Sequence, residues 1–169
     1  LEDCISMVNA SKKSKRILKV GHYLRYSLVS QFAKEILDSG KLGRILYFNG
    51  SYGWDWAWNS KTNFYLDKSM VGGGVLIDSG CHIIDLVLWL LGNCENFNYN
   101  EITGFHGSDD LEDEVHLELF LSSGASGKIT NSRIRTLKNK LEIRGEKGFI
   151  ELDLANPNQG KINVDDTTL

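Results

Sequence analysis

An apolar run at residues 75–91 constrains the fold of this chain more than any other feature. Three glycines at 72–74 precede the run and Gly92 follows it. At about 100° per residue its apolar side chains cover most of the helical circumference, and a helix of that kind is buried. Three polar residues interrupt the run at spacings of i, i+4 and i+7: Asp78, His82 and Asp85. Because these positions fall within an arc of roughly 60°, the sequence predicts a buried helix with one polar stripe.

The polar stripe is a candidate reactive centre. Burying an unpaired carboxylate is costly, so buried acids are paired, solvated or functional. Asp78 and His82 lie close enough for each to shift the other's pKa, and an imidazole so placed can take or give a proton near neutral pH. Two structural interpretations stay open: Asp78 could stabilise the first helical turn through the helix dipole, and His82 could be a hydrogen-bonded core histidine. No third ligand is nearby in the sequence, so no metal site is predicted, and zinc or iron chemistry at His82 is kept only as an alternative.

The segments before this helix predict a mixture of helices and strands. An opening helix comes first, and residues 17–21 have the pattern of a short strand. An apolar stripe predicts a helix at about 27–39, which Gly40 would end. A strand is expected at about 44–52, followed by an irregular segment at 53–70.

The second half of the chain is predicted to be mostly strand. Residues 115–121 alternate with period two, as a half-buried strand does. The acidic stretch 109–114 is interpreted as a solvated loop, and 155–169 as a polar tail. Further strands are expected at four places: 96–104, 127–135, 140–144 and 149–154. Strands that follow helices in this way predict an α+β fold, with a predominantly antiparallel sheet covered by helices on one face.

Composition argues against several classes of protein. Hydrophobic residues make up 41% of the chain and charged residues 24%, which is typical of a globular domain. A net charge of −3 without a basic stripe argues against a nucleic-acid partner. The three cysteines form neither a CxxC pair nor a zinc spacing, which fits a reducing compartment. The apolar run is expected to be too short and too polar to span a membrane, and residues 1–20 do not have the pattern of a signal peptide, so we expect a cytoplasmic protein without a membrane partner.

Residues 72–92 resemble the signature GGG-x-L-x-D-x-G-x-H-x-x-D-L-x-x-W-L-x-G of the glucose–fructose oxidoreductase / inositol dehydrogenase (Gfo/Idh/MocA) family. In this chain the segment reads GGGVLIDSGCHIIDLVLWLLG. Three shorter motifs are also similar to the family: VGHYLRY at 20–26, GKLGRI at 40–45 and IRGEKGFIEL at 143–152. The resemblance covers about residues 1–154 and implies a large open sheet, like that of the C-terminal domain of glyceraldehyde-3-phosphate dehydrogenase.

The resemblance implies that this chain is the C-terminal part of a longer oxidoreductase. Family members begin with a Rossmann domain that binds NAD or NADP, and residues 1–21 would be the remnant of that domain. Residues 22–154 would form the substrate-binding and oligomerisation domain, and 155–169 a polar tail or truncated final segment. The chain contains no GxGxxG and no Glu-Lys-Pro, the motif that normally supplies a catalytic lysine. The main cofactor site is therefore expected outside this chain, which alone is expected to be inactive.

The resemblance also implies roles for single residues. Asp78 and His82 would be the catalytic pair, in which the histidine handles the substrate hydroxyl proton and the aspartate orients or assists it. Five further residues are candidates for substrate binding: Tyr23, Arg25, Trp54, Trp56 and Asp85. Trp54 and Trp56 alternate with Trp58, so core packing or an oligomer interface is the alternative for them. For Tyr23 and Arg25 the alternative is an interdomain salt bridge.

Two functions remain open. The first is an NAD(P)-dependent oxidoreductase that acts on a hydroxyl or ketone of a sugar, cyclitol or sugar nucleotide, as a homo-oligomer joined through the open sheet. The second is a non-catalytic module of the same fold that binds a small molecule or mediates oligomerisation. In either, the alternating apolar residues of 115–121 could serve the core or an interface.

Overall fold

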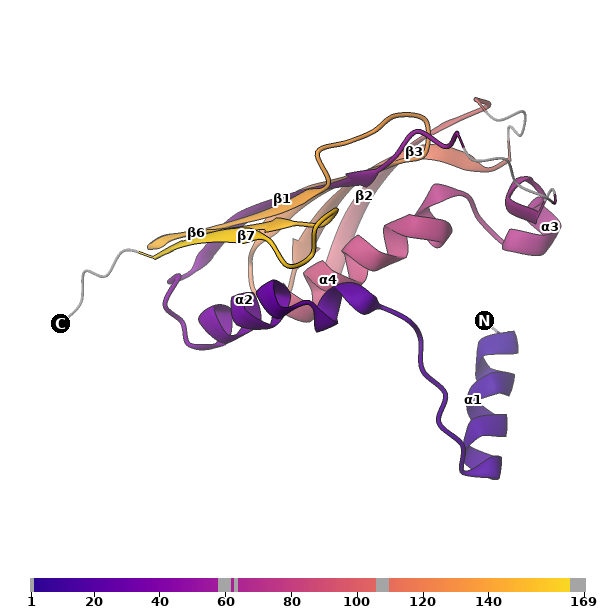
Figure 1. The fold of residues 1–169 in the computed structure, drawn as a ribbon, viewed down its shortest axis with the longest axis horizontal. Coiled ribbons are helices and arrows are strands. Elements are labelled where there is room, and N and C mark those ends of the chain that lie inside the picture. The colour runs from indigo at the N-terminus through magenta and orange to yellow at the C-terminus, as the bar shows by residue number, and fades with distance from the viewer. Residues whose placement is uncertain (1, 58–61, 63, 106–109, 165–169) are drawn as a thin grey trace.

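The computed structural model describes residues 2–57, 62, 64–105 and 110–164, which form a single sheet with helices on one of its faces (Figure 1). The sheet has seven strands in the order β2-β3-β4-β1-β5-β6-β7. In chain order the strands are β1 Ile45–Gly53, β2 Cys94–Thr103, β3 Glu112–Leu121, β4 Ser126–Ser132, β5 Lys140–Gly145, β6 Gly148–Asp153 and β7 Gly160–Val164. Helices α2 (Leu28–Asp38) and α4 (Cys81–Leu91) lie against one side of it.

The pairing of the strands confirms the predicted α+β class with a predominantly antiparallel sheet. Only β1 and β4 run parallel among the described strands, and the other five pairs are antiparallel. The hairpin between β5 and β6 is present where the sequence predicts it. β7 is a strand that the sequence analysis assigned to a polar tail. It pairs with β6 at the edge of the sheet, where one side of a strand needs no partner and little apolar pattern is required.

The helix predicted at 27–39 is present as α2, and both of its ends are capped. The side chain of Ser27 accepts a hydrogen bond from the backbone N–H of Ser30 at 3.1 Å, which caps the first turn. Gly40 follows the helix with a φ of +69°, a left-handed conformation that favours glycine and ends helices. Ala33 is fully buried on the side that faces the sheet. α2 therefore depends on both its caps and its apolar stripe.

The central helical run differs from the continuous α-helix that the sequence predicts. It begins with the short helix α3 (Lys68–Val71), continues through a π-helical turn, η3 (Leu76–Gly80), and ends in α4. The burial of its apolar side chains is confirmed, since Ile83, Leu86 and Val87 are all fully buried under the sheet. The expectation that the run 75–91 is too short to span a membrane concerned a shorter segment; by length and composition alone the longer run Lys68–Leu91 could cross a membrane. Its fully buried residues show that it packs here as a core helix.

Strand β3 directs its alternating apolar residues into the core. Val115, Leu117, Leu119 and Leu121 are all buried and belong to the same hydrophobic cluster as α4. His116 points to the opposite, exposed face, as the alternation predicts. Of the two roles left open for these apolar residues, the structure therefore assigns the core.

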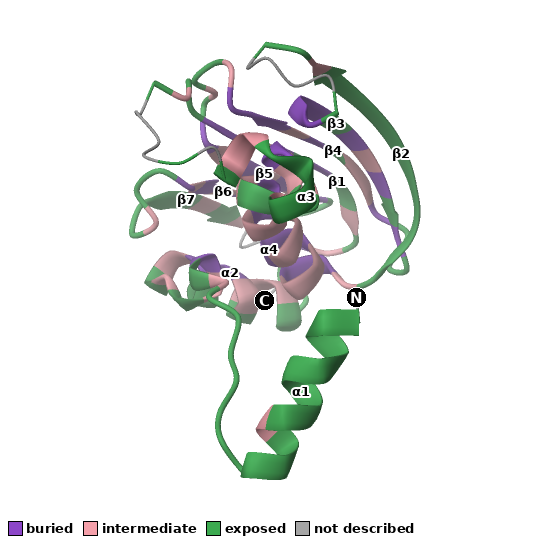
Figure 2. Ribbon diagram, turned by 90° about the vertical axis from the view of Figure 1, so that its right-hand side faces the viewer, coloured by how far each residue is buried: buried purple, intermediate pink, exposed green. Residues whose placement is uncertain are grey.

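The N-terminal segment stands apart from the sheet. Helix α1 (Glu2–Ser14) has no buried residue and is exposed along almost its whole length (Figure 2). The strand expected at 17–21 is not formed, and Ile17 and Val20 are 87% and 74% exposed. A strand needs a neighbour for its backbone hydrogen bonds, and none of the described strands lies beside this segment.

Candidate active site

A cavity of about 330 Å³ lies beside the π-helical turn, where β1 and β4 end. Its lining combines aromatic rings with a few polar groups: Trp54, Trp56, Tyr65, Asp78, Ser132 and Arg133. Concave sites with apolar walls and a small number of placed polar groups are typical of small-molecule binding. The sequence-predicted residues Trp54, Trp56 and Asp78 are thus brought together, whereas Trp58 lies outside the described residues.

The two tryptophans are held by contacts with the ends of the strands. The Trp54 ring meets Tyr52 edge to face, with 4.7 Å between ring centroids. The backbone N–H of Trp56 donates to the carbonyl of Arg133 at 2.8 Å, which ties the segment after β1 to the end of β4. The Arg133 guanidinium also lies 5.2 Å from the centre of the Trp56 ring, within range of a cation–π interaction. The cavity walls are therefore attached to the sheet rather than to a free loop.

Arg133 is the polar residue of the cavity that the sequence analysis missed. Its Nε donates to Oδ1 of Asp113 at 2.7 Å, and Nη1 reaches the carbonyl of Tyr65 at 3.4 Å. Asp113 is fully buried and also accepts from the backbone N–H of Phe105. The remaining nitrogen, Nη2, is buried without a hydrogen-bond partner. A buried donor is normally paired, so Nη2 stands out as a donor without a partner in a residue that lines this cavity.

The interpretation of 109–114 as a solvated loop was wrong for its last three acidic residues, which begin β3; Asp110 is exposed, and residue 109 lies outside the described residues. Glu112, Asp113 and Glu114 are all buried, and each has its own partner. The Glu112 carboxylate accepts the backbone N–H groups of Gly74 and Leu76, at 2.8 and 3.1 Å, and so holds the start of the π-helical turn. Glu114 forms a two-point ion pair with Arg135. The partners Arg133 and Arg135 lie about twenty positions later in the chain, so the local pattern of the acidic residues did not indicate them.

Asp78 lines the cavity from the π-helical turn. Burial raises the pKa of its carboxyl above the ordinary value, and the positive charge of Arg133 opposes that shift, as does His82. The turn is packed closely, since Gly80 leaves room for Asn131, whose side chain donates to the carbonyl of Tyr52 at 2.7 Å. The position of Asp78 is therefore determined by tertiary packing against β4 and β1.

His82 lies one turn further along, among other rings. Its ring centroid is 5.2 Å from that of Tyr23 and 5.8 Å from that of His22. Burial lowers the pKa of His82 and His22 adds to the shift, while the carboxylates of Asp78 and Asp85 oppose it. Nδ1 of His82 is buried and has no hydrogen-bond partner. The imidazole is therefore held in its neutral form with one nitrogen free.

Asp78 and His82 interact through charge, but the described structure contains no hydrogen bond between them. A π-helical turn closes i to i+5 hydrogen bonds and is wider than an α-helical turn. Asp78 therefore lies in a π-helical turn, and not in the continuous α-helix that the sequence predicts, whereas His82 lies in α4. Asp78 instead lines the aromatic cavity, and His82 packs beside Tyr23.

Three other predicted substrate-binding residues are partnered within the chain. Arg25 forms a two-point ion pair with Asp85, with Nε 2.6 Å from Oδ2. The Tyr23 hydroxyl is hydrogen-bonded to that of Tyr52 at 2.7 Å. Burial and this bond raise the pKa of Tyr52. These contacts fix the segment before α2 against α4 and β1, next to His82.

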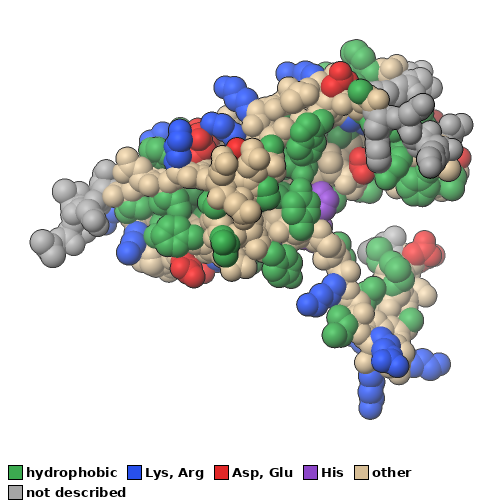
Figure 3. All heavy atoms as spheres, in the orientation of Figure 1, with side chains coloured by type: hydrophobic (Ala, Val, Ile, Leu, Met, Phe, Trp, Pro, Cys, Tyr) green, Lys and Arg blue, Asp and Glu red, His purple; other side chains and the backbone are tan. Residues whose placement is uncertain are grey.

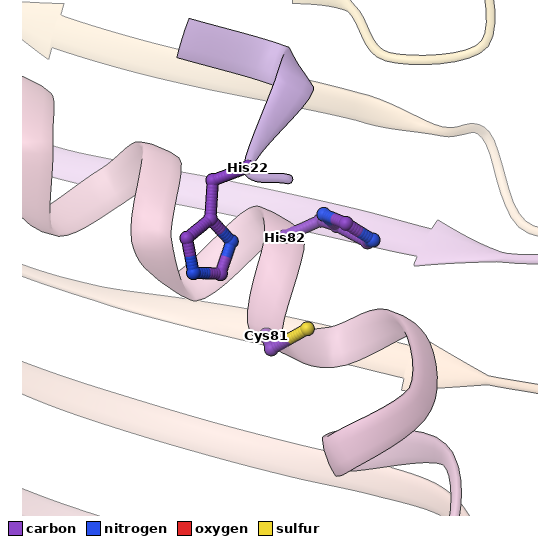
Figure 4. Close-up of side chains that lie close together, drawn as sticks. All are labelled: His22, Cys81 and His82. Atoms are coloured by element: carbon purple, nitrogen blue, oxygen red, sulfur yellow. The ribbon is translucent and has the colours of Figure 1, made fainter. Parts of the chain in front are cut away.

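A possible metal-ligand set also lies at this point. The ligand atoms of His22, Cys81 and His82 are all within 4.8 Å of one another (Figure 4). No third ligand near Asp78 and His82 was predicted from the sequence. Cys81 is adjacent to His82 in the chain, and His22 is brought close only by the fold.

An open sheet, a buried helix on one face and an aromatic cavity with an acid and an arginine define an α+β domain with a candidate site for a small molecule. The chain belongs to the GFO/IDH/MocA family: the model of the GFO/IDH/MocA C-terminal domain matches residues 30–151. The family resemblance of residues 72–92 is thereby confirmed.

Curated relatives and solved structures agree with this assignment. Levoglucosan dehydrogenase of Pseudarthrobacter phenanthrenivorans is 28% identical to the chain, covering 88% of it and 45% of that protein. The 2,7-anhydro-N-acetylneuraminate hydratase of Escherichia coli is 25% identical, covering 90% of the chain and 42% of that protein. A structure of levoglucosan dehydrogenase in complex with NADH and levoglucosan matches with a TM-score of 0.84 at 26% identity, over 99% of the chain and 48% of that one. The chain thus spans about half the length of these relatives.

Proposed function

We propose that this chain is the substrate-binding part of an NAD(P)-dependent oxidoreductase that acts on a hydroxyl or ketone of a sugar, cyclitol or sugar nucleotide. The observation that carries the proposal is the aromatic cavity, which Asp78 and Arg133 line together with Trp54 and Trp56, and in which Nη2 of Arg133 has no hydrogen-bond partner. Sugars present apolar faces that stack on aromatic rings and hydroxyls that need hydrogen-bond partners. The match to a levoglucosan dehydrogenase supports the same class of ligand.

In this proposal His82 handles the proton of the reacting hydroxyl. Its lowered pKa keeps the imidazole neutral near pH 7, so that it can accept that proton. The carboxylates of Asp78 and Asp85 favour the charged imidazole, so they stabilise the cation once the proton has arrived. Asp78 would also orient the substrate, because it lines the cavity directly.

The nicotinamide cofactor, when bound, supplies the hydride acceptor or donor. The unpartnered Nδ1 of His82 fits a site where substrate and cofactor meet, since it leaves one ring nitrogen free for a reacting group. Tyr23 and Arg25 would border this place without touching the reacting atoms, because their polar groups are already bound to Tyr52 and Asp85.

We further propose that residues 1–21 belong to a cofactor-binding domain rather than to this sheet. Several large apolar side chains of this segment are exposed: Ile5, Met7, Val8, Ile17 and Val20. Figure 3 shows hydrophobic side chains along α1, with basic ones gathered at one of its ends. Apolar surface of this extent marks a contact with another part of a protein.

The activity is tested on the full protein with NAD(P)⁺ and a panel of sugars and cyclitols. His82→Ala should reduce turnover by about 10²–10⁴-fold, the range that a general base contributes, while binding of NAD(P) is kept. His116→Ala is the matched control, because His116 lies on the exposed face of the sheet away from the cavity. Undiminished turnover in His82→Ala would contradict the role of His82, and absence of NAD(P)-linked turnover in the wild type would favour the non-catalytic binding module.

A homo-oligomer joined through the open face of the sheet is proposed as the state of the protein. This face has large side chains that are partly exposed, including Tyr47 of β1 and Phe120 of β3. Light scattering on the full protein should give more than one chain per particle. A double variant, Tyr47→Lys with Phe120→Lys, should lower that number, and a monomeric wild type would contradict the proposal.

A further inference from the structure

We propose that His22, Cys81 and His82 form a binding site for a thiophilic divalent cation of the Zn²⁺ type. We also propose that an ion held there inhibits the protein by occupying the imidazole of His82. The binding itself is independent of the proposed function, and only its inhibitory effect rests on it.

The three ligands come from two segments that the fold brings together. His22 precedes the short helix η1 (Tyr23–Tyr26), whereas Cys81 and His82 are the first two residues of α4 (Figure 4). Their ligand atoms lie within 4.8 Å of one another. Zn²⁺ binds imidazole nitrogen and thiolate at about 2.0–2.3 Å in a tetrahedron. Small side-chain rotations that draw the three atoms inward would therefore complete three of its four positions.

Both histidines have a nitrogen that is ready to bind a metal. Nδ1 of His22 and Nδ1 of His82 are each buried without a hydrogen-bond partner. Two buried nitrogens in this state, on histidines whose rings lie 5.8 Å apart, point to a missing ligand, because such atoms are normally satisfied. Nε2 of His22 lies 3.7 Å from Oδ1 of Asp85. A carboxylate on the far nitrogen of a histidine is the usual arrangement behind a metal ligand, where it orients the ring.

Cys81 supplies the selectivity for a thiophilic ion. Its thiol makes only a weak contact, 3.8 Å from Sγ to the carbonyl oxygen of Asp78. Burial and the carboxylates of Asp78 and Asp85 raise the pKa of this thiol, so it is protonated at neutral pH. Binding of M²⁺ would release that proton: the S–H bond breaks, the sulfur–metal bond forms, and one H⁺ leaves to solvent. A water molecule would fill the fourth position.

The binding test uses the full protein, freed of metal with a chelator, and Co²⁺ as a spectroscopic probe that Zn²⁺ then displaces. The wild type should take up one Co²⁺ per chain with a thiolate-to-cobalt absorption band. Cys81→Ser and His22→Gln should each weaken binding by at least about tenfold, since even residues behind the ligands contribute 10–100-fold. Cys94→Ser is the matched control, because Cys94 is exposed and far from both histidines in the fold.

Different experimental outcomes would contradict the metal site and the proposed oxidoreductase function. Absence of binding in the wild type, or unchanged binding in Cys81→Ser, would overturn the site. Cys81→Ala serves as a second variant if the serine protein does not fold. Zn²⁺ should inhibit turnover of the wild type and of Cys94→Ser, and Cys81→Ser should resist it at the same concentration. Stoichiometric binding without inhibition would overturn the inhibitory role, whereas inactivity of the metal-free wild type would instead contradict the oxidoreductase.

Discussion

Arg133 and Asp113 form a buried ion pair at the base of the aromatic cavity, with Nε of the arginine 2.7 Å from Oδ1 of the aspartate. The pair neutralises the guanidinium while leaving Nη2 without a partner. The cavity therefore offers its ligand a directed hydrogen-bond donor without an uncompensated positive charge. That combination suits a neutral hydroxyl or ring oxygen better than a carboxylate.

Arg133→Lys should weaken substrate binding. A lysine keeps the charge beside Asp113 but cannot present a second nitrogen to the cavity, so one charge-assisted hydrogen bond is lost. Such bonds contribute about 1.5–3 kcal/mol, which corresponds to roughly a 10–100-fold higher KM. Steady-state kinetics of the full protein would measure this. Arg135→Lys is the control, because Arg135 pairs with Glu114 away from the cavity, and an equal effect of both variants would argue against a specific role.

Asp113→Ala should lower the free energy of unfolding. The aspartate is completely buried, and its removal would leave the Arg133 guanidinium without its counter-charge. Breaking a buried ion pair by removing one partner costs about 3–5 kcal/mol. Denaturant titration of the protein would measure the change. A loss below about 1 kcal/mol, the value of an exposed pair, would show that the pair is solvated.

The aromatic cavity combines features that the sequence predicts with an ion pair that it does not. The buried helix, strands β1 to β6 and the alternation of Trp54 and Trp56 follow from local periodicity, which needs no knowledge of distant residues. The burial of Glu112–Glu114 could not be predicted in the same way, because it depends on arginines about twenty positions later in the chain. Three consecutive acidic residues, considered without their distant basic partners, predict a solvated loop.

Two further differences have related causes. The π-helical turn at Leu76–Gly80 packs closely against Asn131. The hydrophobic periodicity of the helix carries no information about this tertiary contact. The strand expected at 17–21 has a strand-like composition, but none of the described strands lies next to it to pair with its backbone. The fold class was therefore predictable, whereas the π-helical turn that carries Asp78 was not.

Gly80→Ala should destabilise the π-helical turn. A Cβ at this position would lie 2.6 Å from Oδ1 of Asn131. The Asn131 side chain is fully buried and its Nδ2 donates to the carbonyl of Tyr52, so it cannot move away easily. Overpacking of this kind costs about 1–3 kcal/mol. Thermal unfolding would measure it beside Gly21→Ala, where a Cβ meets nothing within 4 Å. Equal stability of the two variants would contradict the close packing.

The pH dependence of kcat/KM should report the neutral imidazole of His82. Its pKa in the folded protein lies below the ordinary 6.5, and a base acts only when unprotonated. Activity should therefore hold as pH falls through 6.5 and decline only below it. Asp78→Asn removes a carboxylate that raises this pKa, so its acid limb should move to still lower pH, in addition to any loss of rate. An acid limb centred above 6.5 in the wild type would contradict the assignment.

The central claim, that the aromatic cavity holds the substrate and His82 handles its proton, is tested most directly by a crystal structure. The full protein would be crystallised with NAD⁺ and a sugar such as levoglucosan. We expect the sugar ring between Trp54 and Trp56, with a hydroxyl about 2.6–3.2 Å from the His82 imidazole, the reach of a general base. A sugar bound outside this cavity, with His82 contacting neither sugar nor cofactor, would contradict the account.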